Sequence, residues 1–128
     1  MNKLGAAINA ILGKMVSLGS SSSSGIEIGS IGINTPTHIR FSYKYFCGSK
    51  TRGIRACEGK TITINYSSEV VQGELNIQIL DHQKESLIKL ESGVSGTKEI
   101  TATKNSIYQL VISGIKTEGG FDIKWSVK

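Results

Sequence analysis

The sequence predicts an all-β protein, an antiparallel β-sandwich of about eight strands of the jelly-roll or immunoglobulin-like kind. Residues 60–66 (KTITINY) and 74–80 (ELNIQIL) alternate apolar and polar side chains, as strands with one buried and one exposed face do. The chain also contains 15 glycines and only one proline, and its many Thr, Ser, Ile and Val residues favour strands over helices. With 128 residues, 38% hydrophobic and 20% charged, it fits a single folded domain.

Residues 1–19 differ in composition from the rest and predict an amphipathic helix that precedes the domain. Apolar residues recur there at the helical spacing of about 3.6, and Gly19 is placed as a C-terminal stop. These positions are Leu4, Ile8, Ile11, Leu12, Met15 and Leu18. Three interpretations remain open: a secretory signal-like segment, a helix docked on its own domain or on another copy, or a helix lying on a membrane surface. The apolar stretches are shorter than the roughly 20 residues needed to span a bilayer.

Residues 20–25 (SSSSSG) read as a flexible linker, and residues 26–128 form the predicted sandwich domain. Segment 26–33 predicts a strand with a bulge at Gly29, at the edge of a sheet. Residues 48–53, 67–73 and 116–120 are expected to be a basic loop and two turns, because glycine and polar residues interrupt the alternation there. The expected strands are 26–33, 38–47, 54–57, 60–66, 74–80, 87–90, 97–103, 107–113 and 121–127.

The net charge of +5 is concentrated in residues 38–60. This segment holds six Lys and Arg residues against Glu58 alone, so the remainder of the chain is neutral. One interpretation is a solvated sheet face with a basic loop. The other is a patch for an anionic partner, such as an anionic membrane or an acidic glycan. The candidate patch residues are Arg40, Lys44, Lys50, Arg52 and Arg55.

The two cysteines, Cys47 and Cys57, leave three states open: an intrachain disulfide, two free thiols or an intermolecular bridge. No CxxC pair is present and the histidines are only His38 and His82, so we expect no zinc site of the usual kind. Neither histidine has a nucleophile signature beside it, and the sequence contains no nucleophile elbow or phosphate-binding glycine loop. We therefore expect no enzymatic activity and no cofactor.

The second half of the domain carries four motifs: GKTITINY, GELNIQIL, SIYQLVISGI and GGFDIKWSV. A glycine precedes an alternating strand, Tyr108 opens a late strand, and Gly120, Phe121 and Trp125 mark the last one. Over about residues 38–127 this pattern resembles the bacterial pre-peptidase C-terminal-like sandwich, a small all-β module of secreted proteins. The resemblance implies a secreted or cell-surface location. The chain departs from that family by lacking an Asp-rich strand, with GELNIQIL in its place.

These observations favour a non-enzymatic module that acts by association. The preferred hypothesis is self-association or binding to an envelope protein, with the N-terminal arm as the assembly element. The alternatives are a membrane-active protein that uses the arm and the basic patch, and a module that binds glycans or anionic polymers. The basic segment lacks interleaved exposed aromatic residues for base stacking, so we do not expect nucleic-acid binding.

Overall fold

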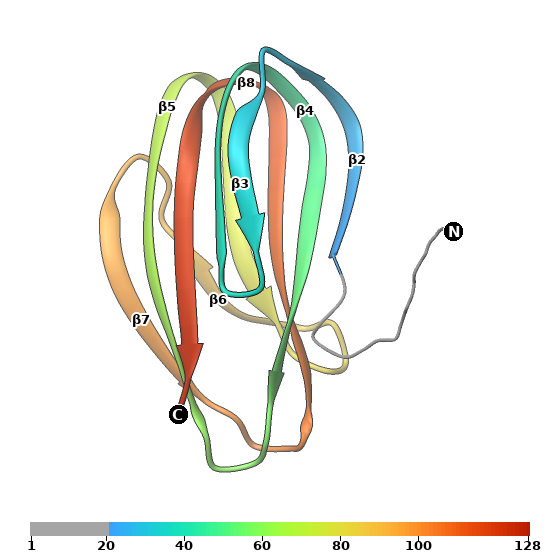
Figure 1. Ribbon diagram of the computed structural model, residues 1–128, viewed down its shortest axis with the longest axis vertical. Coiled ribbons are helices and arrows are strands. Elements are labelled where there is room, and N and C mark those ends of the chain that lie inside the picture. Colours follow the sequence, from blue (N-terminus) through green and yellow to red (C-terminus); the bar gives the residue numbers. More distant parts are fainter. Residues whose placement is uncertain (1–20) are drawn as a thin grey trace.

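The structure, a computed structural model, describes residues 21–128 of the chain. They form one antiparallel sheet of seven strands (Figure 1): β2 (Ser21–Ile28), β3 (Ile31–Thr35), β4 (His38–Ala56), β5 (Thr61–Leu80), β6 (Ser86–Leu90), β7 (Ser95–Thr101) and β8 (Ser106–Val127). The predicted all-β antiparallel class is confirmed. The predicted helix over residues 1–19 lies outside the described residues.

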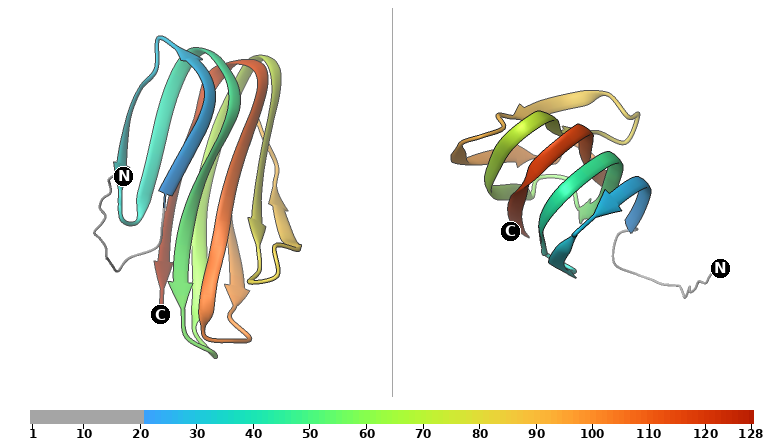
Figure 2. Two further views of the ribbon diagram at one scale, coloured as in Figure 1. Left: turned by 90° about the vertical axis from the view of Figure 1, so that its right-hand side faces the viewer. Right: turned by 90° about the horizontal axis from the view of Figure 1, so that it is seen from above.

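Three long strands organise the sheet. β8, with 22 residues, pairs with β4 on one side and with β5 on the other along nearly its whole length. Their pairing shifts register between Tyr43 and Gly48 and between Val70 and Glu74. At that level the strands arch over, as Figure 2 shows, and the sheet folds back on itself. A sandwich results from one bent sheet, because extra residues at bulges increase local bending.

The arch divides the sheet into two layers. Layer 1 contains β2, β6 and residues 49–56, 74–80 and 106–113 of the long strands. Layer 2 contains β3, β7 and residues 38–43, 61–69 and 119–127. Each long strand therefore contributes one half to each layer, and the two layers face each other.

The hydrophobic core fills the space between the layers. Alternate residues point inward, so cross-strand neighbours such as Ile54 and Tyr108, or Ile64 and Trp125, are buried together. Burying one such side chain contributes about 1.5–3 kcal/mol. The buried apolar residues are Ile39, Tyr43, Phe46, Ile54, Ala56, Ile62, Ile64, Tyr66, Leu75, Ile77, Ile79, Leu90, Ala102, Tyr108, Leu110, Ile112, Phe121, Ile123 and Trp125.

The turns and loop predicted inside the long strands are wrong. Residues 48–53 continue β4, residues 67–73 continue β5, and residues 116–120 continue β8. All three segments pair with neighbouring strands, at or beside the arch. Polar residues and glycines there belong to continuous strands at or beside the bend, which local sequence does not distinguish from a turn.

The predicted linker is also corrected in part, since Ser21–Ile28 form strand β2 and pair with residues 45–52 of β4. The predicted edge strand over 26–33 is two strands, because the chain turns at Gly29 between β2 and β3. Both do lie at a sheet edge, each pairing with β4 in a different layer.

Two glycines allow the effect of backbone conformation to be distinguished from the effect of steric crowding. Gly73, at the bend of β5, has a φ of +82°, and a Cβ added to it would lie 2.3 Å from the Lys116 carbonyl oxygen. Gly93 has a nearly identical φ of +80° but no atom within 4 Å of the added Cβ. The pair therefore shares a conformation that disfavours L-residues and differs only in space.

We expect Gly73→Ala to lower the free energy of unfolding by about 3 kcal/mol or more, because backbone strain and overpacking add. Gly93→Ala should cost only about 1 kcal/mol, since strain acts alone there. Chemical denaturation followed by circular dichroism measures both values. Equal losses in the two variants would show that the bend tolerates a side chain.

Candidate binding edge at strands β2 and β3

Within residues 21–128, the outward edges of β2 and β3 form a free sheet edge, here called the β2–β3 edge, with few of the side chains that block pairing with another strand. Neither SSSSGIEI nor IGINT contains Lys, Arg or Pro, and Glu27 is the only charged residue. At the opposite edge, β6 carries Lys89 and β7 carries Lys98 and Glu99. Because natural proteins use charges and proline to block edge pairing, the two edges of this sheet differ in their capacity to add a strand.

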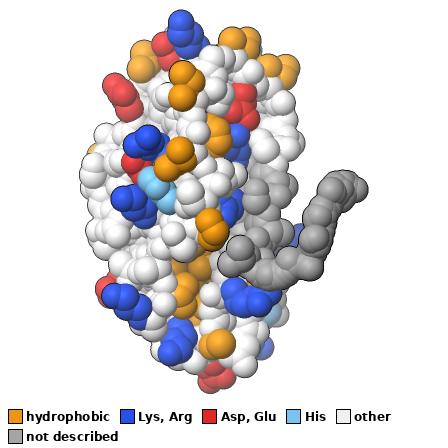
Figure 3. Space-filling view, in the orientation of Figure 1, with side chains coloured by type: hydrophobic (Ala, Val, Ile, Leu, Met, Phe, Trp, Pro, Cys, Tyr) orange, Lys and Arg blue, Asp and Glu red, His pale blue; other side chains and the backbone are white. Residues whose placement is uncertain are grey.

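Exposed isoleucines lie along the outer side of the β2–β3 edge. Ile26 and Ile28 of β2 are 61% and 58% exposed, and Ile31 and Ile33 of β3 are 76% and 39% exposed. Their registers place the β2 pair opposite Cys47 and Tyr45, on the outer side of the arch, and the β3 pair on the outer face of layer 2. Figure 3 shows hydrophobic side chains following the middle of the face that carries β3.

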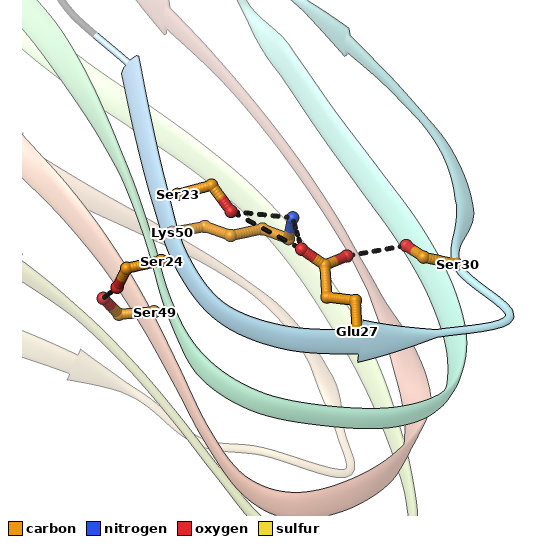
Figure 4. A network of polar contacts seen from close by, with 6 residues as sticks. All are labelled: Ser23, Ser24, Glu27, Ser30, Ser49 and Lys50. Carbon is orange, nitrogen blue, oxygen red and sulfur yellow. Dashed lines mark hydrogen bonds and ion pairs between the residues drawn. The ribbon is translucent and has the colours of Figure 1, made fainter.

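A polar network holds β2 from the inner side (Figure 4). The Nζ of Lys50 donates to Glu27 Oε2 at 2.6 Å and to Ser23 Oγ at 3.4 Å. Ser30 Oγ, beyond the end of β2, donates to the other carboxylate oxygen at 2.8 Å. Lys50 is buried, and its Nζ lies 4.2 Å from the centre of the Phe41 ring in layer 2, within the range of a cation–π contact.

Glu27 is the carboxylate that balances this buried lysine. Partial burial raises the pKa of Glu27, but hydrogen bonds from Lys50 and Ser30 and the charge of Lys50 outweigh it. The pKa of Glu27 therefore lies below its usual value of 4.5. The network joins β2 and β4 by an ion pair in addition to their backbone pairing.

Arg52 connects the two layers beside this network. Its Nη1 donates to the side-chain oxygen of Asn34 in β3, and its guanidinium lies 5.2 Å from the centre of the Trp125 ring. Burial lowers the pKa of Arg52. Through Lys50 and Arg52, β4 therefore contacts β2 and β3 from inside the sandwich.

The predicted basic patch is not a single surface. Arg40, Lys44 and Arg55 are exposed, whereas Lys50 and Arg52 point inward and are each only 6% exposed. The difference follows from the continuity of β4: residues 50, 52 and 54 alternate with 51, 53 and 55 as in any strand. A role of the three exposed residues in binding an anionic partner stays a prediction.

An intrachain disulfide between Cys47 and Cys57 does not form, and both cysteines are free. Because residues 48–53 extend β4, the two positions are separated by about 30 Å of extended chain. A disulfide requires Cα atoms within about 7 Å. An intermolecular bridge stays a prediction.

Neither histidine lies in β2 or β3. His38 Nε2 is 2.6 Å from Asp122 Oδ1, a pair joining β4 and β8 in layer 2, and His82 is exposed between β5 and β6. Within residues 21–128, no three His, Cys, Asp or Glu side chains cluster as metal ligands would. The same residues include no helix of a length and hydrophobicity suited to crossing a membrane.

A hollow of about 720 Å³, which the sequence did not indicate, lies at the opposite edge, where the chain crosses from β6 to β7. Leu75, Ile77 and Leu90 are its apolar residues. Its polar residues are Tyr66, Asn76, Gln78, Lys89, Glu91, Ser92, Lys98 and Ser113. These residues come from separate strands. The alternation of apolar and polar residues placed Asn76 and Gln78 on the exposed face of a strand but did not indicate a site there.

The Glu27–Lys50 pair predicts a specific acid sensitivity. A lowered folded-state pKa contributes stability that is fully present above pH 4.5 and is lost as pH falls through that pKa. Glu27→Gln should reduce the free energy of unfolding at pH 7 by about 2–4 kcal/mol, since Lys50 then stays buried without its partner. It should also flatten the stability profile below pH 4.5. Denaturant titrations from pH 7 to pH 3 measure this, with Glu85→Gln, an exposed acid, as the control. Parallel profiles for wild type and Glu27→Gln would contradict it.

No protein-family model matches the chain, and no curated protein matches it significantly. Among solved structures, the chain is similar to TmCBM61, determined in complex with β-1,4-galactotriose, with 10% identity over 88% of each chain and a TM-score of 0.50. It is also similar to Aeromonas hydrophila PliG, a periplasmic inhibitor of g-type lysozyme, with 11% identity over 77% of this chain and 89% of that one and a TM-score of 0.48. A third similarity, to the enzymatically active domain of bacteriophage CBA120 tailspike protein 4, has 14% identity over 88% of this chain and 20% of that one and a TM-score of 0.46. At 10% identity, the likeness to TmCBM61 extends to the fold alone: an all-β antiparallel sandwich.

Proposed function

We propose that this protein is a non-enzymatic, secreted or cell-surface module that self-associates through the β2–β3 edge. The observation that carries the proposal is the combination of unprotected edge strands with four exposed isoleucines. Free edge strands offer unpaired N–H and C=O groups, and adding a strand from another chain satisfies them. Outward side chains of the added strand would then pack beside the isoleucines on the outer face of the extended sheet.

The inner contacts support the proposal because they hold the edge in place before binding. Lys50 pairs with Glu27 of β2, and Arg52 contacts Asn34 of β3. An edge that is already ordered loses less conformational entropy when a partner strand docks.

A hollow on β3 supplies a place for a partner side chain. It measures about 290 Å³ and is lined by residues 31–33 of β3 and 40–42 of β4. Two of its lining residues, Ile31 and Ile33, are exposed isoleucines of the edge. An apolar side chain from a second copy would fit into this hollow.

The N-terminal arm enters the proposal as an additional assembly element. Residues 1–19 immediately precede the edge in the sequence, and their apolar stripe could extend the contact with a second copy. A role at an anionic membrane, with Arg40, Lys44 and Arg55 facing the headgroups, is the competing proposal for the arm. Both depend on residues outside the part of the chain that the structure describes.

We expect Ile31→Lys to raise the self-dissociation constant at least about tenfold, or about 1.4 kcal/mol, because a lysine placed against a docked strand must be desolvated or displaced. Leu87→Lys is the matched control: it places the same charge on a 45% exposed apolar residue of β6, at the opposite edge. Light scattering over a concentration series measures the mass of each variant.

Deleting residues 1–20 separates the arm from the edge, because it leaves β2 complete. If the arm contributes, the truncated protein associates more weakly than the full chain while Ile31→Lys still weakens it further. A full-length protein that stays monomeric at high concentration, or that loses association equally in Leu87→Lys, would refute the edge as the interface.

A second candidate function, glycan binding, is favoured by the 720 Å³ hollow at the β6–β7 edge. Its volume falls in the usual range for ligand sites, about 300–1,000 Å³. Its lining residues include Asn76, Gln78 and Tyr66. Amides both donate and accept hydrogen bonds, which suits the hydroxyl groups of a sugar.

For this candidate, replacing Asn76 and Gln78 together with alanine should weaken glycan binding at least about tenfold, since each lost hydrogen bond costs about 0.5–1.5 kcal/mol. Gln109→Ala removes an amide from β8 outside the hollow and should leave binding unchanged. Isothermal titration against soluble oligosaccharides, chosen from a glycan array, measures the effect. Absence of any array signal for the full chain would eliminate this function.

A further inference from the structure

Arg52 is a buried charge that the described part of the chain leaves without a counter-ion. It points inward because it lies opposite Leu110, which is fully buried. Only 6% of the residue is exposed. No acidic side chain within residues 21–128 forms an ion pair with it, and its buried Nε has no hydrogen-bond partner there. Buried charges in proteins are normally paired.

Lys50, the other buried cation of β4, provides a comparison for Arg52. Lys50 precedes Arg52 on the inner face of β4 and is equally buried. It donates hydrogen bonds to a carboxylate and a hydroxyl group, and it lies over an aromatic ring. The one carboxylate of the β2–β3 edge, Glu27, is used by Lys50. Arg52 has the aromatic contact and a neutral amide, but no anion.

A hollow of about 280 Å³ lies beside Trp125; Arg52 does not itself line the hollow but contacts the Trp125 ring. It is lined by Ile54, the inward-facing residue that follows Arg52 along β4, and by Trp125, on whose ring the Arg52 guanidinium rests. The turn residues Pro36 and Thr37 also line it, and Arg55 adds a second positive charge. None of its lining residues is acidic.

We propose that Arg52 anchors a site for a carboxylate group that enters by the hollow beside Trp125. A carboxylate is planar and accepts two parallel hydrogen bonds from a guanidinium. Because the Nε is buried and Arg52 does not line the hollow, side chains beside the guanidinium move aside to let the carboxylate engage the Nε together with an Nη. The hollow is small, which fits a single carboxylate-bearing unit such as a uronic acid or the C-terminal residue of a peptide. This inference does not depend on the proposed self-association.

Trp125 provides a built-in probe, because it is the only tryptophan in the chain. The full-length protein is titrated with sodium glucuronate, with acetyl-Ala-Ala bearing a free C-terminus, and with sodium acetate. Glucose, acetyl-Ala-Ala amide and sodium chloride at matched ionic strength are the controls. We expect a saturable change in tryptophan fluorescence with carboxylates only.

Two arginine variants locate the response. Arg52→Lys keeps the positive charge but removes the Nε donor and the fork geometry, so the carboxylate dissociation constant should rise at least about tenfold. Arg40→Gln removes an exposed arginine on the outer face of the same strand and should change it by less than about twofold, as expected for a screened surface charge. The indole N–H resonance of Trp125 in the wild-type protein gives a second readout that needs no variant.

Each outcome of these titrations either supports or overturns the proposed carboxylate site. A response to glucuronate alone identifies an acidic sugar as the source, a response to the peptide alone identifies a C-terminus, and either supports the site. An equal response to chloride, equal weakening in Arg40→Gln and Arg52→Lys, or an indole resonance unmoved by every carboxylate overturns it. Loss of self-association in Ile31→Lys has no bearing on these results, so the two proposals fail separately.

Discussion

The pairing of β8 with both β4 and β5 through a common arch is the constraint on which the molecule depends. Because the three strands bend at one level, each supplies inward side chains to both layers, and the core is built from only three long segments. The bend requires backbones to approach closely. Gly73 lies against the backbone of residues 115–117, and Gly114 lies under the Phe46 ring. Side chains at these points would separate the strands that the core holds together.

The same arch explains why the β2–β3 edge differs from the rest of the surface. β4 is long and bent, and its free side is covered in two pieces, by β2 in layer 1 and β3 in layer 2. Two short strands cannot bury the edge of the core by themselves. The positions nearest that edge therefore carry Lys50 and Arg52, whose long side chains fill the space with apolar stems and polar ends. Order at this edge comes from charge and hydrogen bonding more than from apolar packing.

The sequence predicted the fold class because alternation is a local property. Residues 61–66, 74–80, 107–113 and 121–127 lie in strands, and their alternate apolar residues are buried as expected, apart from Val127, which is 37% exposed. It did not predict that these segments join into single strands. The bends at 67–73 and 114–120 are rich in glycine and polar residues, as turns are, and only pairing with a neighbouring strand distinguishes the two. Strand order and the meeting of Tyr66, Asn76 and Lys98 in one hollow depend on topology, which has no local signal.

The basic segment shows how one local error changes a functional hypothesis. With residues 48–53 taken as a loop, Lys50 and Arg52 joined Arg40 and Arg55 in a surface patch. As part of β4 they alternate inward, and the excess charge is divided between a solvated outer face and a buried edge. A surface arginine needs no partner, because water solvates it and salt screens it. A buried one is normally paired, since little water is left to solvate it. Because Arg52 points inward, the positive charge of this segment indicates a site at one residue and not a diffuse surface patch.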